Sequence, residues 1–284
     1  MSKQKVAIVT DSTAYIPKDA MGDFDIPIIP LWLHWGQDSF RDGVDIDPSA
    51  FYRRLQESKD FPTTSQPSAG EFEELYQRVG AGVDGIVGIF ISSKISGTVA
   101  NAQASMAQFP DTPIRVIDSL TTSMSLGFVV LEAARAAAAG KSLDEVVAVA
   151  ESARDRVRIL FTVGSLEYLY RGGRIGGANR LMGTMLSIKP LLHLYNGGIE
   201  PLGKVRTKRK AVARMWEIAE EQLGGKRMAE ACALYIGDRD EGNAIGEQIK
   251  ARFNVPTVYC TTVSPVIGAH VGPGTVGLAF RIES

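Results

Sequence analysis

Short, nearly uninterrupted apolar runs in the first half of the chain constrain its fold more than any other feature of the sequence. Such runs, rich in Val and Ile, lie at residues 5–10, 85–92 and 114–118. Their length and continuity are typical of strands that are buried on both faces, as in parallel sheets. A further apolar run lies at 28–35. Pro27 precedes it and Pro30 lies within it, and these prolines favour an edge strand or a strand that starts late.

Predicted helices alternate with these runs. An N-cap aspartate followed by proline stands at 47–48, and Ser-x-x-Glu capping boxes stand at 68–71 and 142–145. An alanine-rich stretch at 124–139, closed by a glycine, predicts a helix that is buried over much of its surface. Strands that alternate with helices predict a three-layer α/β domain, in which a mainly parallel sheet lies between helices.

The second half of the chain has a different pattern. A predicted strand at 159–164 is followed by a short helix and by a Gly/Arg-rich segment at 171–180. Runs at 188–195 and 199–206 flank an Asn-Gly-Gly turn and predict a β-hairpin. The remaining predicted elements are, in order, a helix at 208–223, a strand at 228–236, a helix at 241–253, and strands at 257–263 and 276–281. This half is therefore predicted to be an α+β domain with a mixed sheet.

Length and composition agree with two ordinary domains. The chain has 284 residues, of which 45% are hydrophobic and 22% are charged. A domain usually takes about 150 residues, so we place a boundary near residue 158, which gives domains 1–158 and 159–284. The composition excludes a disordered chain, a collagen-like chain and a disulfide scaffold.

Charge and targeting signals narrow the functional classes. The 31 Lys and Arg residues against 32 Asp and Glu give a net charge of −1, so there is no global basic excess to hold nucleic acid or an anionic membrane. Cys232 and Cys260 match no metal spacing, and we expect both to be reduced core residues. The amino-terminal apolar run is too short for a signal peptide, and prolines and glycines interrupt the uncharged stretch at 253–280. We therefore expect a soluble, cytoplasmic protein without stable membrane insertion.

Familiar enzyme signatures are missing from the sequence. It has no G-x-S-x-G nucleophile elbow, and residues 140–142 resemble only the end of a P-loop, because Arg135 stands where the first glycine belongs. The G-x-G-x-x-G spacings at 80–85 and 272–277 precede strands, so neither has the strand–turn–helix context of a dinucleotide site. No metal-ligand spacing relates the three histidines, His34, His193 and His270. We therefore assign no catalytic residue, metal or cofactor.

Hydroxyl residues at predicted helix entrances are the remaining candidates for a site. Residues 63–68 (TTSQPS) precede a capped helix, and residues 92–98 (SSKISGT) lie between a buried strand and the next helix. In an open parallel sheet, the loops after the carboxyl ends of strands line the binding crevice, and helix N-termini attract carboxylates and phosphates. Because Ser and Thr are also common capping residues, these segments are either helix caps or an anion site.

His270 and two basic clusters add to these candidates. His270 lies in a glycine-dense segment, 266–274, which we predict to be a loop that approaches a ligand closely. If folding brings it beside the hydroxyl segments, it is a donor for an anion. The basic clusters at 171–180 and 203–210 are either solvated faces or contacts to an anion or a partner. Aromatic residues are not interleaved with these charges, so we expect no nucleic-acid site.

Several motifs occur in order over essentially the whole chain. They are VTDSTAYIP (9–17), TTSQPSAGEF (63–72), ISSKISGT (91–98), IDSLTTSMSLG (117–127), RGGRI (171–175), IKPLL (188–192), GKVRTKRKA (203–211) and VIGAHVGPG (266–274). Together they resemble the DegV family, the fatty-acid-binding proteins that serve as the acyl-carrying subunit of bacterial fatty acid kinase. Ala69 departs from the proline that many relatives have at this position.

The resemblance implies a fold and a set of site residues. It implies two α/β domains with a long apolar tunnel between them, which holds a fatty acid with its carboxylate at a polar cluster. Carried over to this sequence, the carboxylate-binding residues are Thr64, Ser65, Ser96, His270 and Arg174. The supporting loop residues are Gly97 and Gly268, and the residue that faces the kinase is Arg206.

The hypothesis that follows is a binding protein rather than an enzyme. The resemblance implies that it presents a long-chain fatty acid to a separate ATP-dependent fatty acid kinase, which gives acyl phosphate for lipid synthesis. A C16 chain buried at about 0.8 kcal/mol per CH₂ gains roughly 12 kcal/mol before ordering costs, so the tail can supply the affinity. The alternatives are an acyl hydrolase or transferase that uses Ser96 and His270, and a small-anion or sugar-phosphate binding protein.

Overall fold

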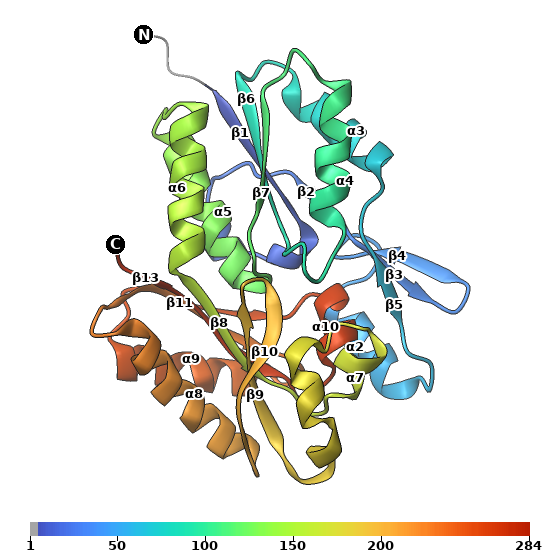
Figure 1. The fold of residues 1–284 in the computed structure, drawn as a ribbon, viewed down its shortest axis with the longest axis vertical. Coiled ribbons are helices and arrows are strands. Elements are labelled where there is room, and N and C mark those ends of the chain that lie inside the picture. The colour runs from blue at the N-terminus through green and yellow to red at the C-terminus, as the bar shows by residue number, and fades with distance from the viewer. Residues whose placement is uncertain (1–4) are drawn as a thin grey trace.

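A parallel sheet forms the core of the first half of the chain in the computed structural model, which describes residues 5–284 apart from the side chains of 184–187 (Figure 1). Its strand order is β2-β1-β6-β7, and the strands are β1 (Val6–Asp11), β2 (Ile28–Ile29), β6 (Gly85–Phe90) and β7 (Ile114–Asp118). Every residue of β6 is buried, as expected for a strand that is covered on both faces. The predicted strand at 28–35 is divided, because Pro30 separates β2 from β3 (Trp32–Trp35).

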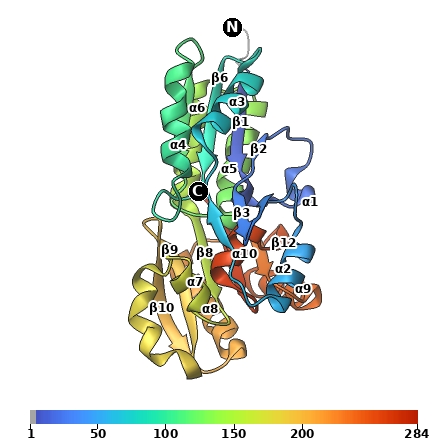
Figure 2. The same ribbon diagram turned by 90° about the vertical axis from the view of Figure 1, so that its right-hand side faces the viewer.

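Helices cover both faces of this sheet, as Figures 1 and 2 show. The helices are α5 (Ser123–Ala138) and α6 (Leu143–Arg156) on one face, and α3 (Ala69–Gly80) and α4 (Thr98–Ser105) on the other. Side chains of neighbouring residues in β6 point to opposite faces of the sheet. Val87 packs in the core with α5 and α6, whereas Ile86 packs in the core with α3. Both predicted capping boxes are formed, at the starts of α3 and α6. This arrangement confirms the predicted three-layer α/β fold of the first half.

The second half of the chain forms a mixed sheet with the strand order β10-β9-β8-β13-β11-β12. The strands are β8 (Val157–Thr162), β9 (Lys189–Tyr195), β10 (Gly198–Val205), β11 (Met228–Tyr235), β12 (Val258–Thr262) and β13 (Val276–Ile282). Strands β11 and β12 pair in parallel, and the other neighbours pair antiparallel. Helices α8 (Lys208–Leu223) and α9 (Arg239–Phe253) cover one face. The predicted mixed sheet and its β9–β10 hairpin are therefore confirmed.

Helix α5 joins the two sheets. It packs on β1 and β6 of the parallel sheet and also contacts β8 and β13 of the mixed sheet. Most of its residues are buried, as its alanine-rich sequence predicts. Arg135 of α5 adds a polar link, because its Nη2 donates to Glu230 Oε1 on β11 at 2.6 Å, and Glu230 also accepts a hydrogen bond from Arg281.

Residues 32–65 form an extension in which the strand at 32–35 and the helix start at 47–48 are predicted, whereas the small sheet is not. Strands β3, β4 (Asp38–Arg41) and β5 (Thr63–Ser65) make an antiparallel sheet of order β4-β3-β5. Between β4 and β5, helix α2 (Pro48–Glu57) begins at the predicted aspartate cap. The extension reaches the second half of the chain, because Tyr52 of α2 donates its hydroxyl hydrogen to Val263 O at 2.8 Å.

The glycine-dense segment at 266–274 is largely helical, so the prediction of a loop is wrong. Helix α10 (Pro265–Val271) begins at the N-cap Ser264, with proline in its first turn, and ends at Gly272, whose φ is 71°. Gly268 lies inside the helix, where a Cβ would collide with a tyrosine ring of α2. These glycines therefore allow close packing and helix termination rather than a flexible loop.

The remaining short helices are η1 (Ser12–Ala14), α1 (Lys18–Met21), η2 (Met106–Gln108), α7 (Glu167–Arg171) and η3 (Gly176–Ser187). Among the described residues, no helix is long and apolar enough to cross the membrane. Cys232 is buried, as predicted for a core residue, whereas Cys260 is only partly buried, and both are free thiols.

Candidate binding cavity between the two sheets

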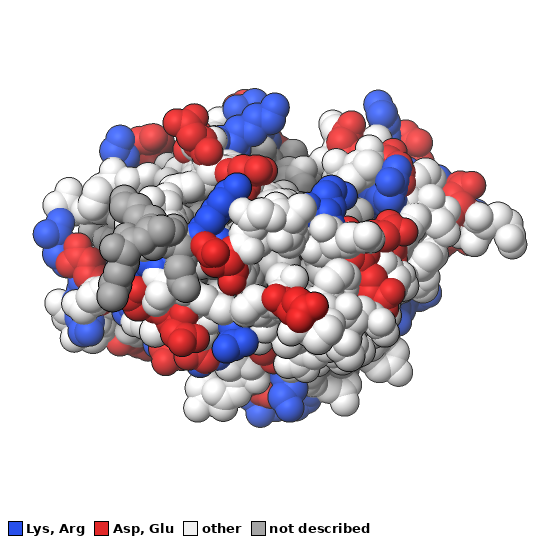
Figure 3. Space-filling model, turned by 90° about the horizontal axis from the view of Figure 1, so that it is seen from above, with Lys and Arg blue, Asp and Glu red and all other residues white. Residues whose placement is uncertain are grey.

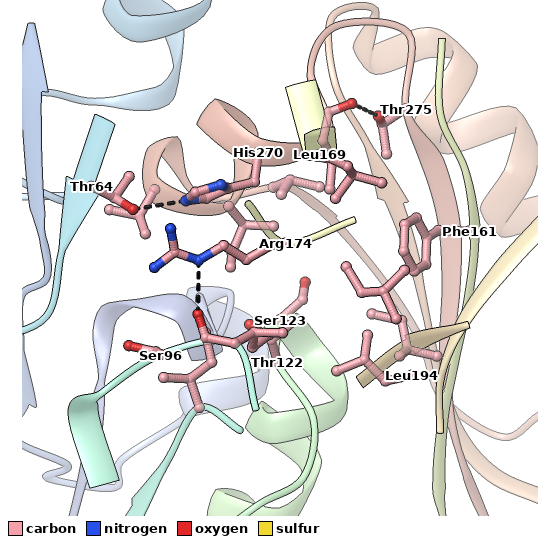
Figure 4. Close-up of a pocket in the computed structure, with 18 of the residues that line it drawn as sticks. Thr64, Ser96, Thr122, Ser123, Phe161, Leu169, Arg174, Leu194, His270 and Thr275 are labelled. Atoms are coloured by element: carbon pink, nitrogen blue, oxygen red, sulfur yellow. Dashed lines mark hydrogen bonds between the residues drawn. The ribbon is translucent and has the colours of Figure 1, made fainter. Parts of the chain in front are cut away.

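A narrow cavity lies between the loops of the parallel sheet and the inner face of the mixed sheet (Figure 4). Its open volume is about 70 Å³, several times the roughly 10–15 Å³ that a single water needs. In Figure 4, Thr64 and Ser96 lie at one end, and Phe161 and Leu194 lie at the other. The apolar lining includes Phe161, Leu169, Leu194, Ile199, Leu234 and Val263. The cavity therefore offers hydrogen bonds at one end and apolar contact at the other.

Thr64 and His270 meet at the polar end. Strand β5 supplies Thr64, and the last turn of α10 supplies His270, so the pair joins segments 206 residues apart. Thr64 Oγ1 lies 2.7 Å from His270 Nε2. The next residue, Ser65, also lines the cavity, and its Oγ lies 2.8 Å from Nε2 of His34. The structure thus brings the predicted His270 beside the first hydroxyl segment.

The environment of His270 keeps its ring neutral near pH 7. Burial, together with the charge of Arg174, lowers its pKa from 6.5 to about 4. Its Nδ1 is buried and has no hydrogen-bond partner among the described residues. A Cβ at Gly172 would collide with this ring, so the absence of a side chain there lets α7 and α10 approach each other. His270 can therefore exchange hydrogen bonds with a ligand or a hydroxyl group without carrying charge.

Arg174 reaches the same cavity from the turn after α7. Its Nε donates to Ile95 O at 3.1 Å, and its Nη1 donates to Gly172 O at 2.7 Å. Both acceptors are backbone carbonyls, and no carboxylate of the described part of the chain pairs with this guanidinium. The side chain is therefore fixed in place while its positive charge remains available to an anion.

The second hydroxyl segment contributes Ser96. Its Oγ lies 2.8 Å from Thr98 Oγ1 and accepts a hydrogen bond from Thr98 N at 3.3 Å, at the start of α4. Ser96 also lines the cavity, beside Gly97, where a Cβ would press on the side chain of Gln66. By contrast, Ser68 is exposed and belongs to the capping box of α3. The two hydroxyl segments thus contain both kinds of residue: Ser68 caps a helix, and Ser96 lines the cavity.

Among the cavity residues absent from the predicted site are two hydroxyl residues without a hydrogen-bond partner among the described residues. Thr122 and Ser123 follow β7 and begin helix α5, and both line the cavity. Their position in the sequence could have indicated this role, because they belong to a run of hydroxyl residues directly after a predicted strand, as Ser96 does. Their motif contributes to the family resemblance, but nothing in the local sequence separates a cap from a cavity wall.

The contacts of His270 and Ser96 do not form a nucleophile–base pair. His270 Nε2 is bonded to Thr64, and Ser96 Oγ is bonded to Thr98. The orienting group that a catalytic histidine needs is also absent among the described residues, because nothing bonds to Nδ1. No group of three or more His, Cys, Asp or Glu residues in the described part of the chain could hold a metal ion.

Other members of the basic clusters lie outside the cavity. Arg206 is exposed and directly follows β10. Arg171 pairs with Glu167 at 2.7 Å, and Arg180 lies 3.5 Å from Glu200. On the face shown in Figure 3, acidic and basic side chains are interspersed with uncharged ones, and neither sign dominates.

Comparison with known proteins gives matches over almost the whole chain. A family model described as "Uncharacterised protein, DegV family" matches residues 5–283. A DegV domain-containing protein of Streptomyces coelicolor is 40% identical over 275 residues, which cover 96% of this chain and 97% of that protein.

Solved structures give matches of the same extent. A fatty-acid-binding DegV family protein from Thermus thermophilus has a TM-score of 0.92 and 34% identity, over 98% of this chain and 100% of that one. DegV from Bacillus subtilis, a fatty acid binding protein, has a TM-score of 0.90 and 33% identity, over 99% of this chain and 100% of that one. This chain is therefore similar to fatty-acid-binding proteins in both sequence and fold.

Proposed function

Because the chain belongs to the DegV family, we propose that it binds a long-chain fatty acid in the cavity between its two sheets. The observation that carries this proposal is the division of the cavity into a hydroxyl-lined end and an apolar end. A small polar anion would leave the apolar wall without a partner, whereas a fatty acid matches the character of both ends, and the apolar end has to widen beyond its open volume of about 70 Å³ to take a C16 chain. The fatty acid binding of the Thermus and Bacillus relatives supports the same class of ligand.

The carboxylate lies at the polar end in this proposal. Its ligands are Thr64, Ser65, Ser96, His270 and Arg174, all of which line the cavity. Hydroxyl groups that donate to a carboxylate form charge-assisted hydrogen bonds, and the neutral His270 orients the hydroxyl of Thr64. Gly97 and Gly268 support the site, because their missing side chains let α4 and α10 pack closely beside it.

The acyl chain supplies most of the affinity. Each buried CH₂ contributes about 0.8 kcal/mol, so a C16 tail gains roughly 12 kcal/mol before the cost of ordering is subtracted. The head group then needs orienting hydrogen bonds rather than a tight ion pair. This fits a site in which Arg174 is bonded to backbone carbonyls.

The proposal includes a separate ATP-dependent fatty acid kinase as the partner. In the reaction, a carboxylate oxygen attacks the γ-phosphorus of ATP, the bond to the ADP oxygen breaks, and acyl phosphate and ADP form. The sequence of this chain contains no phosphate-binding loop, so ATP and Mg²⁺ belong to the kinase. Arg206 faces the kinase, which is supported by its exposure and by its place in the basic run at 203–210.

The ligand is tested by mass spectrometry of organic extracts of the purified protein, beside a binding titration with palmitic acid. We expect a long-chain fatty acid in the extract and saturable binding after its removal. A protein that is empty after purification and does not bind palmitic acid contradicts the proposal. Saturable binding of inorganic phosphate, with no binding of the fatty acid, would point to a small-anion binding protein instead.

The partner is tested separately with Arg206→Ala. We expect unchanged palmitic acid affinity, an unchanged melting temperature, and a large loss of kinase-dependent acyl phosphate formation. Arg227→Ala is the matched control, because Arg227 is also exposed and belongs to neither the cavity nor the basic run. Loss of fatty acid affinity in Arg206→Ala, with kinase docking intact, would place this arginine at the wrong site.

A further inference from the structure

The amino-terminal end of helix α5 opens onto the cavity. The helix spans Ser123–Ala138, and among the described residues its N-cap, Thr122, makes no side-chain capping bond. The first N–H groups of a helix have no partner within the helix, and the aligned peptide dipoles place partial positive charge at this end. An uncapped helix start at a cavity wall therefore attracts an anion, if the cavity contains one.

A second observation points to a ligand at the same place. Thr122 and Ser123 are only 5% and 3% exposed, and both line the cavity. Neither Thr122 Oγ1 nor Ser123 Oγ has a hydrogen-bond partner among the described residues. A buried hydroxyl without a partner is costly, so an unfilled pair of donors at a cavity wall indicates that a ligand completes them.

Neighbouring hydroxyls in the same segment behave differently. Thr121 Oγ1 lies 2.6 Å from Ser125 Oγ, and Ser125 Oγ also donates to Thr122 O at 2.9 Å. These two side chains are buried and do not line the cavity. Within this segment, the side-chain hydroxyls of Thr121 and Ser125 are paired, and those of Thr122 and Ser123, which face the cavity, are not.

We propose that Thr122, Ser123 and the amino-terminal end of α5 form part of the carboxylate-binding site, as additional donors beside Thr64 and Ser96. This inference rests on the proposed binding of a fatty acid. An ionised carboxylate accepts about four hydrogen bonds. Thr64 and Ser96 each share a bond with a neighbouring side chain, whereas Thr122 and Ser123 keep their full capacity. Figure 4 shows Thr122 and Ser123 on the wall between Ser96 and the apolar end.

The role of these groups differs from that of Arg174. The guanidinium of Arg174 is bonded to backbone carbonyls of two segments. The end of α5 supplies positive potential from fixed backbone dipoles, which need no rearrangement when the anion arrives. The helix end and its two hydroxyls therefore discriminate between an ionised head group and a neutral one.

The test compares palmitic acid with 1-hexadecanol, which has the same chain length and a neutral head group. The variant Thr122→Val/Ser123→Ala removes both hydroxyls at nearly constant shape. We expect it to weaken palmitic acid binding roughly ten- to hundredfold and to weaken hexadecanol binding much less. With carboxyl-¹³C palmitic acid, the bound carboxyl group should titrate at a higher pH in the variant than in the wild type.

Stability separates a binding role from a structural one. Because neither hydroxyl has a partner in the described structure, the melting temperature of the ligand-free variant should stay unchanged or rise. Thr121→Val is the matched control: it breaks the Thr121–Ser125 bond, so its melting temperature falls while the ratio of the two affinities stays that of the wild type. Ser123→Gly is the second variant. It removes the Ser123 hydroxyl without backbone strain, because glycine readily adopts the φ of 54° at this position.

The outcomes are distinct. Suppose that the wild type binds normally, and that the ratio of palmitic acid to hexadecanol affinity is unchanged in the double variant and in Ser123→Gly. This result overturns the inference and leaves the proposed function intact. A fall in the melting temperature with an unchanged ratio assigns these hydroxyls a structural role and also overturns it. A wild type that binds neither ligand overturns the proposed function and this inference together.

Discussion

Helix entrances in this protein are of two kinds. Helix α3 begins with a closed capping box, in which Ser68 N donates to Glu71 Oε2 at 2.8 Å and Glu71 N donates to Ser68 Oγ at 3.3 Å. Helix α6 begins in the same way. Helices α4 and α5 begin at the cavity, and within the described structure their N-caps, Gly97 and Thr122, make no side-chain capping bond. The closed entrances use their donors within the helix start, and in our proposal the entrance of α5 keeps its donors for a ligand, whereas in α4 Thr98 N donates to Ser96 Oγ.

These two pairs of helices also differ at the residue three positions after the cap. A glutamate stands there in α3 and α6, and its carboxylate occupies the place that an external anion would take. In α4 the same position holds Ala100, and in α5 it holds Ser125. The missing glutamate does not by itself mark an open entrance, because Thr207 caps α8 and Ser264 caps α10 without one.

The largest effect is expected for Gly172→Ala, beside the open entrances. The new methyl group would collide with the ring of His270, which should lower the free energy of unfolding by about 3 kcal/mol and break the contact with Thr64. Fatty acid affinity should fall with it. Urea denaturation and a palmitic acid titration measure the two effects.

Gly70→Ala, near the closed entrance of α3, is the matched control. No atom of the described structure lies within 4 Å of the added Cβ. The change should leave affinity intact and raise the free energy of unfolding by about 1 kcal/mol or less. Equal losses in the two glycine variants would remove the distinction between the two kinds of entrance.

The second effect is a pH dependence located at the cavity. Because the pKa of His270 falls from 6.5 to about 4 on folding, the unfolded chain binds a proton over this interval and the folded chain does not. The stability of the wild type should therefore fall by about 3 kcal/mol relative to His270→Gln as the pH is lowered from 7 to 4. Urea denaturation of both proteins across this range measures the difference.

The comparison with His270→Gln is needed because buried acids act in the opposite sense. Burial raises the pKa of Asp42 to about 7 and of Asp11 to about 6, so these groups increase stability as the pH falls over the same interval. Their effect cancels between the two proteins. The capping box of α6 loses its contribution to stability only at a lower pH, because hydrogen bonds from Ser142 to the carboxylate lower the pKa of Glu145 from 4.5. A stability difference that does not change between pH 7 and 4 would contradict the neutral, buried state of His270.

The third effect is expected for Ser96→Ala, at the entrance of α4. Loss of one charge-assisted hydrogen bond should weaken fatty acid binding by about 2 kcal/mol, with tail burial compensating in part. Kinase-dependent turnover should fall further, because the carboxylate is then misplaced for attack. Full turnover by Ser96→Ala would remove this serine from the site.

The smallest effect is expected for Ser68→Ala, which opens the closed entrance of α3. Loss of the N-cap should lower the free energy of unfolding by about 1 kcal/mol. Palmitic acid affinity should stay that of the wild type, because Ser68 is exposed and does not line the cavity. A loss of affinity comparable to that of Ser96→Ala would show that the two entrances are not functionally distinct.

Local patterns in the sequence predicted the parts of the fold that depend on local physics. The apolar run at 85–92 gave a strand buried on both faces, and the Ser–Glu spacings gave the capping boxes of α3 and α6. The motif resemblance to the DegV family is confirmed by the match over residues 5–283. These features were predictable because each depends on residues close together in the chain.

Features that depend on distant contacts were not predictable in this way. Strand β5 exists because Thr63–Ser65 pair with β3, and α10 packs on Tyr52 of α2. Thr122 and Ser123 belong to the cavity wall because the mixed sheet lies opposite them, whereas the adjacent Thr121 is satisfied by Ser125. Neighbouring hydroxyls therefore have different roles that only the folded structure separates.

The position of α5 has a consequence for how the protein unfolds. Its side chains, among them Phe128, share one buried cluster with residues of both sheets, such as Val87 of β6 and Phe161 of β8. Removing either sheet would expose an apolar flank of this helix to water, so neither half can open fully while the other stays native. We expect a single cooperative transition in calorimetry, and amides of β6 and β13 that exchange hydrogen with the same, global opening free energy. A binding cavity that lies beside such a shared helix persists only as long as the whole chain remains folded.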